Sequence, residues 1–144
     1  MHRAQEPNLG LWSPPGGKLH VDEGESPHAC ASREAAEELG IGIAANEARL
    51  TGVITETGHA GNAHWLMFLF EITTKLQEVP PPHREGRFAF HSRAALDSLP
   101  LPATDREMIW PLFWKHRGGF FAARCLTVAG RPNEWTVEQS NVKL

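Results

Sequence analysis

The residues of this sequence with the clearest potential for chemistry are three acids in the segment 24–41, namely Glu34, Glu37 and Glu38. In an α-helix each residue advances by about 100°, so residues three and four positions apart share a face and these carboxylates would lie side by side. Like charges one turn apart repel by roughly a few tenths of a kcal/mol per pair. Since Mg²⁺ prefers oxygen ligands, such a row of carboxylates could bind it. The alternative is a solvated acidic face, which these local features alone favour.

The order of residues around these glutamates resembles a known family signature. The string Arg33-Glu34-Ala35-Ala36-Glu37-Glu38-Leu39-Gly40-Ile41 follows Glu25 after seven residues, and Gly16-Gly17 stands upstream. This resembles the Nudix box: Gly, five residues, Glu, seven residues, then Arg-Glu-U-x-Glu-Glu-x-Gly-U, where U is aliphatic. The sequence departs from it in one place, because seven residues rather than five separate Gly17 from Glu25. Glu23 would leave nine residues before Arg33, so we assign Glu25 and expect a longer loop over 18–23.

The resemblance implies an α/β/α sandwich around a mixed β-sheet and a hydrolase of nucleoside diphosphates linked to another moiety. The implied cofactor is Mg²⁺, with Mn²⁺ as the alternative. The implied metal ligands are Glu37, Glu38 and the carbonyl group of Gly16, while Glu34 would contact the metal through water or act as a base.

Two more site residues follow from the same resemblance. Arg33 would pair with Glu25 and hold the helix and the loop in register. This family commonly takes a further acid from a loop beyond the box, and Glu85 stands just before a predicted strand. A solvent-exposed loop glutamate is the alternative for Glu85.

The segment 104–113, followed by Gly118-Gly119-Phe120-Phe121, resembles MutT-type enzymes that act on oxidised purine nucleoside triphosphates. By that likeness Asp105 and Trp110 are candidates for base binding, since a carboxylate can read a purine edge and an indole can stack. Alternatively, Asp105 favours a helix N-terminus and Trp110 belongs to the core.

The elements that must position these residues can be read from capping and periodicity. Ser26 can cap a helix over 27–39, Pro27 suits its first position and Gly40 suits the residue after its end. The opposite side of this helix carries mostly small residues, which would let it approach a sheet: Ala29, Ser32, Ala35, Ala36 and Leu39. The remaining predicted elements are an antiparallel pair at 50–56 and 64–72, strands at 87–90, 120–128 and 135–137, and a helix at 105–115 capped by Thr104.

The N-terminus departs from the family pattern, because only about ten residues precede Leu11 and they are polar and turn-like. The strand expected ahead of Gly16-Gly17 is therefore missing, or the segment 120–128 fills its place, or a partner molecule does. An unfilled sheet edge invites association, so we expect weakened stability or a homodimer.

Composition narrows the class of protein. The chain has 144 residues, which suits one domain over 1–144, and 14 Lys+Arg against 17 Asp+Glu offer no broad basic surface for a nucleic acid polymer. Two cysteines are too few for a disulfide framework, and we find no signal peptide or membrane span, so we expect a cytoplasmic protein. A zinc site is disfavoured, because His28 and Cys30 are separated by one residue on the predicted helix and would point apart. We expect the eight histidines at scattered surface or core positions.

We therefore expect a Mg²⁺-dependent pyrophosphohydrolase acting on a nucleoside triphosphate or a nucleoside diphosphate derivative, such as an oxidised purine nucleotide. Hydrolysis of ADP-ribose is the nearest alternative. A Nudix-fold module that senses a nucleotide without cleaving it is a different class. The complete set of Glu34, Glu37 and Glu38 argues against it, while the missing strand argues mildly for it.

Overall fold

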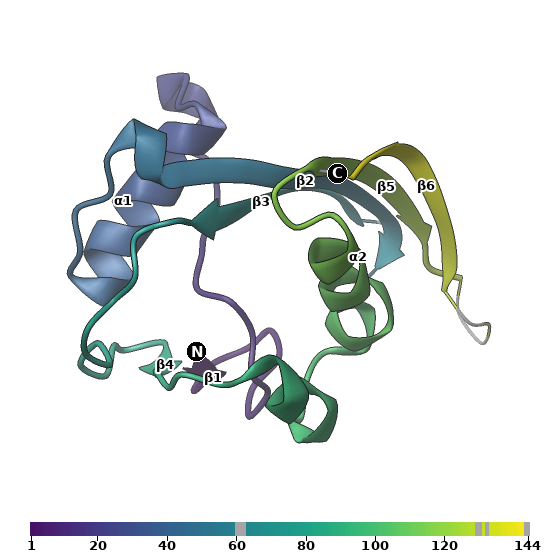
Figure 1. Cartoon of the computed structure of the whole chain (residues 1–144). Coiled ribbons are helices and arrows are strands. Elements are labelled where there is room, and N and C mark those ends of the chain that lie inside the picture. The colour runs from purple at the N-terminus through teal and green to yellow at the C-terminus, as the bar shows by residue number, and fades with distance from the viewer. Residues whose placement is uncertain (60–62, 129–130, 132, 143–144) are drawn as a thin grey trace. The chain divides into compact units, whose positions relative to one another are not determined.

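The structure, a computed structural model, describes residues 1–59, 63–128, 131 and 133–142 (Figure 1). The chain divides into two compact units, which are described separately below: unit 1 comprises Met1–Ala48 and Ile72–Arg106, and unit 2 comprises Arg49–Glu71 and Glu107–Leu144. Residues 60–62 of the predicted loop lie outside the described residues. One domain over 1–144 stays a prediction. Among the described residues, no helix has the length and apolar character that crossing a membrane would require.

Unit 1 contains the helix that carries the three glutamates. This helix, α1 (Pro27–Leu39), has the predicted bounds. The Ser26 hydroxyl accepts a hydrogen bond from the Ala29 amide at 3.1 Å, and Pro27 occupies the first turn, where its missing N–H costs nothing. Gly40 ends the helix in the left-handed conformation with φ 68°, which a glycine adopts without the steric cost of a Cβ.

A strand does precede the Gly16-Gly17 pair in unit 1. It is β1 (His2–Arg3), which pairs antiparallel with β4 (Gly86–Arg87) and matches His2 with Arg87. The suggestion that the first strand is missing is therefore wrong. The local pattern could not reveal this strand, because its partner is more than eighty residues away along the chain. The short helical turns of unit 1 are η1 (Val21–Glu23), η2 (Ala45–Glu47) and η3 (Arg93–Ser98).

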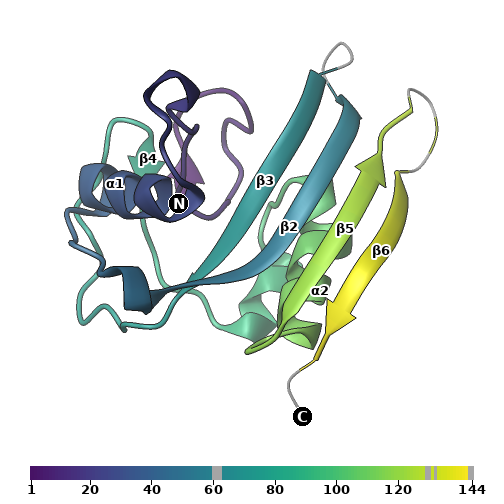
Figure 2. The same ribbon diagram turned by 90° about the horizontal axis from the view of Figure 1, so that it is seen from above.

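Unit 2 contains a four-stranded sheet in the order β3-β2-β5-β6 (Figure 2). The strands are β2 (Ala48–His59), β3 (Ala63–Ile72), β5 (Phe120–Leu126) and β6 (Glu134–Asn141). β2 and β5 are parallel, whereas β5 and β6 are antiparallel, so the predicted mixed sheet is confirmed. The short connection between β2 and β3, which are neighbours in the sheet, requires the predicted antiparallel pair.

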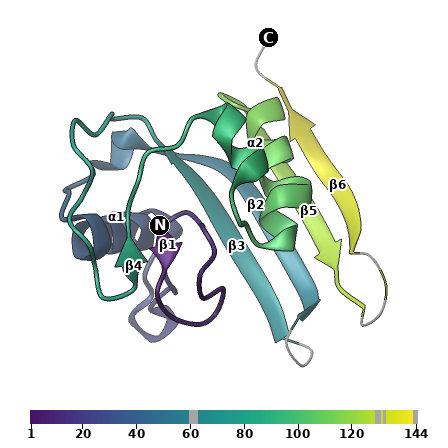
Figure 3. The same cartoon turned by 90° about the horizontal axis from the view of Figure 1, so that it is seen from below.

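The core of unit 2 lies between the sheet and the helix α2 (Trp110–Lys115), which crosses one sheet face (Figure 3). Its buried members are Ile54, Leu112, Phe121 and Ala123. This confirms that the second helix covers a sheet face.

The start of this helical segment differs from the prediction. The first helical turn begins at Ala103, so Thr104 lies inside it and is not the cap. Residues Asp105–Ile109 then form a wider π-type turn, η4. Pro111 accounts for this turn, because a proline lacks an N–H group and its ring would clash with the carbonyl oxygen four residues earlier.

Candidate functional site

Glu38 is the most buried of the three glutamates of α1, with 5% of its surface exposed. The Gly16 amide donates a hydrogen bond to Glu38 Oε2 at 3.1 Å, so the loop that precedes α1 meets the helix at this carboxylate. Burial raises the pKa of Glu38, and the negative charges of Glu85 and Glu34 raise it further. The Gly16 hydrogen bond and His83 offset this only in part. The Glu38 carboxylate is therefore held in a site that disfavours its charge.

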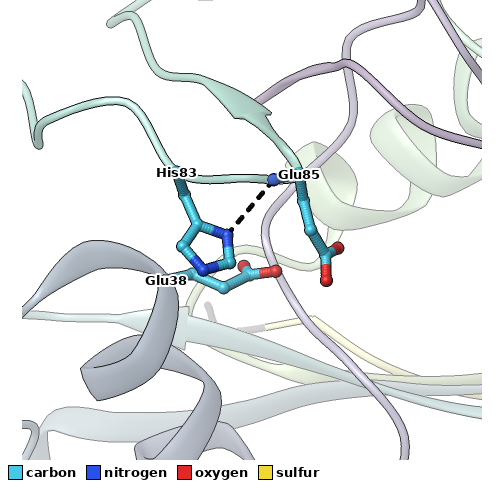
Figure 4. Close-up of side chains that lie close together, drawn as sticks. All are labelled: Glu38, His83 and Glu85. Carbon is cyan, nitrogen blue, oxygen red and sulfur yellow. Dashed lines mark hydrogen bonds between the residues drawn. The ribbon is translucent and has the colours of Figure 1, made fainter.

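Glu38 belongs to a three-residue cluster with His83 and Glu85, whose potential ligand atoms all lie within 4.8 Å of one another (Figure 4). A tight turn brings the latter two residues there, because the His83 and Gly86 amides each donate to the other's carbonyl oxygen, at 2.8 and 3.0 Å. The Glu85 amide also donates to His83 Nδ1 at 3.4 Å. The guanidinium of Arg3, on β1, lies 3.9 Å from Glu85. The loop acid predicted at Glu85 thus lies beside Glu38.

His83 is the residue that sequence reasoning missed. The sequence predicts the histidines at scattered surface or core positions. The available signal was its position two residues before Glu85, in a segment already singled out for a further acid. The turn places both side chains at Glu38, which spacing along the chain alone could not show (Figure 4).

Arg33 fastens α1 to the preceding loop. Its Nε lies 2.8 Å from Glu25 Oε1 and its Nη2 lies 3.0 Å from Glu25 Oε2, so the pair is bidentate. Nη2 also donates to the Lys18 carbonyl oxygen at 3.0 Å. The hydrogen bonds from Arg33 are the largest cause that lowers the pKa of Glu25 to about 2. Glu23 is exposed and lies 3.6 Å from His20. The acid that pairs with Arg33 is therefore Glu25, as predicted, and not Glu23.

Gly17 lets the loop before α1 pass close to the Glu34 carboxylate. A Cβ at Gly17 would lie 2.1 Å from Glu34 Oε1, so only a glycine lets the loop pass this close to the carboxylate. Glu34 Oε1 also accepts a hydrogen bond from Arg33 Nη1 at 2.6 Å. The loop, Glu34 and Arg33 are therefore packed against one another, and substitution at Gly17 would displace the Glu34 carboxylate.

The three glutamates do not form one equivalent row. The Glu37 side chain is 57% exposed and lies 3.6 Å from Arg33, while Glu34 is hydrogen-bonded to Arg33 and Glu38 faces the cluster. Of the residues expected on the covered side of the helix, Ala35 is buried, whereas Ala29 and Ala36 are exposed. The helical period therefore predicted the covered face only in part.

The two base-binding candidates lie in the helical segment that runs from η4 into α2. Asp105 is part-buried in η4, and Trp110 begins α2. The Trp110 ring contacts Phe113 at 5.7 Å and stacks on Trp114 at 6.2 Å. Its Nε1 is buried and has no acceptor among the residues that the structure describes. Trp110 therefore packs in an aromatic cluster, as the core interpretation predicts, and it also has an indole N–H without an acceptor among the described residues, which base binding could use.

The donor set of the cluster suits a divalent cation. Two carboxylates meet an imidazole, and the positive charges near the buried Glu38, which include the Met1 amino group, do not offset the effect of its burial. A cation would relieve the repulsion between Glu38 and Glu85, and oxygen ligands are those that Mg²⁺ and Mn²⁺ prefer. The residues present therefore fit the metal that the Nudix resemblance implies.

Comparison with known proteins agrees with the fold and the order of these residues. The model of the NUDIX domain family matches residues 1–110, and the chain belongs to the Nudix family. It is similar to the uncharacterized Nudix hydrolase YvcI of Bacillus subtilis (strain 168), with 31% identity over 108 residues. The match covers 73% of this chain and 66% of that relative, slightly less than two thirds of the relative's length.

A solved structure supports the fold itself. The mutator MutT protein from Bacillus halodurans matches with a TM-score of 0.73 and 24% identity, over 93% of this chain and 86% of that one. At this identity the likeness shows the fold alone. The predicted Nudix-type α/β/α fold with a mixed sheet is confirmed.

Proposed function

We propose that the protein is a Mg²⁺-dependent pyrophosphohydrolase, with Mn²⁺ as an alternative metal. Its substrate would be a nucleoside triphosphate or a nucleoside diphosphate derivative. The observation that carries the proposal is the buried Glu38 carboxylate, crowded by Glu85 and Glu34 in a chain of the Nudix family. The Met1 amino group lies near enough to interact with Glu38, yet burial and the neighbouring carboxylates still disfavour the charge, and a bound cation would relieve this cost.

The chain's own residues would share the work as follows. Glu38 and Glu85 would hold the metal, with His83, Glu37 and the Gly16 carbonyl group as further candidates. When bound, a divalent cation neutralises charge on phosphate oxygens and lowers the pKa of water. Arg33 would keep Glu34 fixed for proton transfer, since it holds both Glu34 and Glu25.

We further propose an oxidised purine nucleoside triphosphate as the substrate. Support comes from the printed name of the structural relative, a mutator MutT protein, and from the buried Trp110 Nε1 that lacks an acceptor among the described residues. An indole donor can hydrogen-bond to a purine oxygen or nitrogen. Asp105 stays a second candidate for reading the base.

The experiment is a screen of nucleoside triphosphates, oxidised purine nucleotides and ADP-ribose, with Mg²⁺ or Mn²⁺, that follows phosphate and pyrophosphate release. Glu38→Gln should reduce turnover by several orders of magnitude while the fold persists. Binding without turnover of any substrate would instead indicate a nucleotide-sensing module. Full turnover in the Glu38→Gln variant would refute the metal assignment.

Localisation and assembly also remain proposals. Cys30 and Cys125 are both buried free cysteines, which suits the proposed cytoplasmic location. A homodimer stays a prediction, but its ground, an unfilled place for the first strand, is removed by the presence of β1.

A further inference from the structure

The turn that carries Glu85 leads directly into an arginine with no ion-pair partner. Arg87 is exposed on β4, two residues after Glu85, and forms no ion pair with any carboxylate among the described residues. Its guanidinium carbon lies over the Trp12 ring, 5.6 Å from the ring centroid. An exposed cation stacked on an indole is positioned in advance to receive an anion.

Trp12 is itself held firmly. Its ring meets His2 at 5.0 Å and His91 at 4.4 Å, both edge to face, and its amide donates to the Pro100 carbonyl oxygen at 2.8 Å. His2 also pairs with Arg87 in the β1–β4 register. The indole is therefore a fixed surface under the guanidinium, rather than a mobile side chain.

The position of this pair relative to the carboxylate cluster follows from chain geometry within unit 1. Two residues span at most about 7 Å between Cα atoms, so Arg87 starts close to Glu85. Trp12 is four residues before Gly16, whose amide binds Glu38. Arg87 is thus joined by a short segment to Glu85 of the cluster, and Trp12 to Gly16, which hydrogen-bonds to Glu38 of the cluster.

We infer that Arg87, held in place by Trp12, forms a phosphate-binding subsite next to the Glu38–His83–Glu85 cluster. This inference rests on the proposed function and specifies which residue of that site binds the anionic part of the substrate. The guanidinium presents a planar fork of donors that matches two phosphate oxygens, while Trp12 acts as a positioning residue for it. The ligand class is a diphosphate or polyphosphate group, including that of a nucleotide.

The chain offers a matched control in the same turn. Arg84 is exposed, lies one residue before Glu85 and, like Arg87, forms no ion pair with the described residues. Unlike Arg87, it stacks on no aromatic ring among them. Replacement of either arginine by alanine removes one positive charge near the cluster, so a general electrostatic effect would be equal in the two variants.

The experiment measures binding of methylenediphosphonate, which is not hydrolysed, to the full chain in Mg²⁺ by calorimetry. Arg87→Ala should weaken binding by about 10- to 100-fold, the usual range for a lost hydrogen-bonded charge contact. Arg87→Lys should recover only part of the loss, since it lacks the planar fork. Arg84→Ala should change binding by less than about threefold, in line with an exposed charge.

Trp12 is tested by a double-mutant cycle. Trp12→Phe retains an aromatic surface and should bind nearly as well as the wild type, whereas Trp12→Leu should weaken binding. The double variant Trp12→Leu with Arg87→Ala should lose no more than Arg87→Ala alone, because Trp12 acts through Arg87. Thermal melting of each variant shows whether the fold is retained. Additive losses in a folded double variant would mean that Trp12 does not position Arg87.

The results separate this inference from the proposed function. Equal losses in the Arg84→Ala and Arg87→Ala variants, or no binding of the probe by the wild type, would overturn the inference. If the wild type binds the probe and Arg87→Ala alone weakens it, the subsite stands even where no substrate is hydrolysed. Turnover in the screen, with unchanged probe binding in the Arg87→Ala variant, would leave the proposed function standing and remove the subsite.

Discussion

Replacing Glu38 by glutamine should stabilise the metal-free protein while it removes the response to metal. Glu38 is buried, and its ligand atom lies within 4.8 Å of that of Glu85. Two unit charges at that separation repel by about 3.5 kcal/mol at an effective dielectric constant near 20. The Arg3 guanidinium, 3.9 Å from Glu85, and the Gly16 hydrogen bond to Glu38 offset part of this. We therefore expect a net gain of about 1–2 kcal/mol in the free energy of unfolding.

The assay is thermal unfolding in the presence of a chelator and then in Mg²⁺. A gain of this size corresponds to a rise of roughly 3–6 °C in the melting temperature for a chain of this length. Mg²⁺ at about 100 times its dissociation constant should stabilise the wild type by about 2.7 kcal/mol, and the Glu38→Gln variant by much less. The order of the two melting temperatures should therefore reverse when metal is added.

The matched control is Glu37→Gln, the same chemical change at the neighbouring, exposed side chain. Without metal it should change the free energy of unfolding by less than about 0.5 kcal/mol. The reasoning is refuted if Glu38→Gln lowers the melting temperature in chelator while Glu37→Gln does not. That result would mean that the fold stabilises the charge of Glu38.

Three further predictions follow from the loop and the helix. Gly17→Ala should lower turnover with little loss of fold, because the new Cβ would displace the flexible end of Glu34; kinetics and circular dichroism together check this. The hydrogen bonds from Arg33 lower the pKa of Glu25 to about 2. The ionised Glu25 carboxylate therefore stabilises the fold above about pH 4.5, and this stabilisation is lost as the pH falls toward 2. Urea unfolding between these pH values should show that loss in the wild type and much less of it in Arg33→Gln. Ser26→Ala should cost about 1 kcal/mol in urea unfolding, because the cap of the Ala29 amide is lost.

Local chemistry made part of the site predictable. The caps at Ser26 and Gly40 fix α1 by short-range hydrogen bonds, so its bounds follow from a few neighbouring residues. The Arg33–Glu25 pair also forms over a short separation, and the structure contains it. The catalytic and metal-binding roles stay predictions.

Features set by distant contacts could not be predicted. β1 exists because it pairs with β4, and the burial of Glu38 beside His83 depends on a turn some forty residues later. Periodicity identifies which residues share a helix face, but only the packed neighbours determine that Ala36 is exposed while Glu38 is covered. Pro111 disfavours a regular helix in the turn before it, but whether that turn widens or breaks depends on its packing in the fold.

The hydrogen bonds of Arg33 have a consequence for how this chain tolerates changes in length. The Arg33 guanidinium donates hydrogen bonds to both ends of the 18–25 segment, to the Lys18 carbonyl oxygen and to the Glu25 carboxylate. The residues between these ends form the outward turn η1, in which Val21 is 77% exposed. Insertions in this turn should therefore extend into solvent. They should leave the position of α1 relative to Gly16 and Gly17 unchanged.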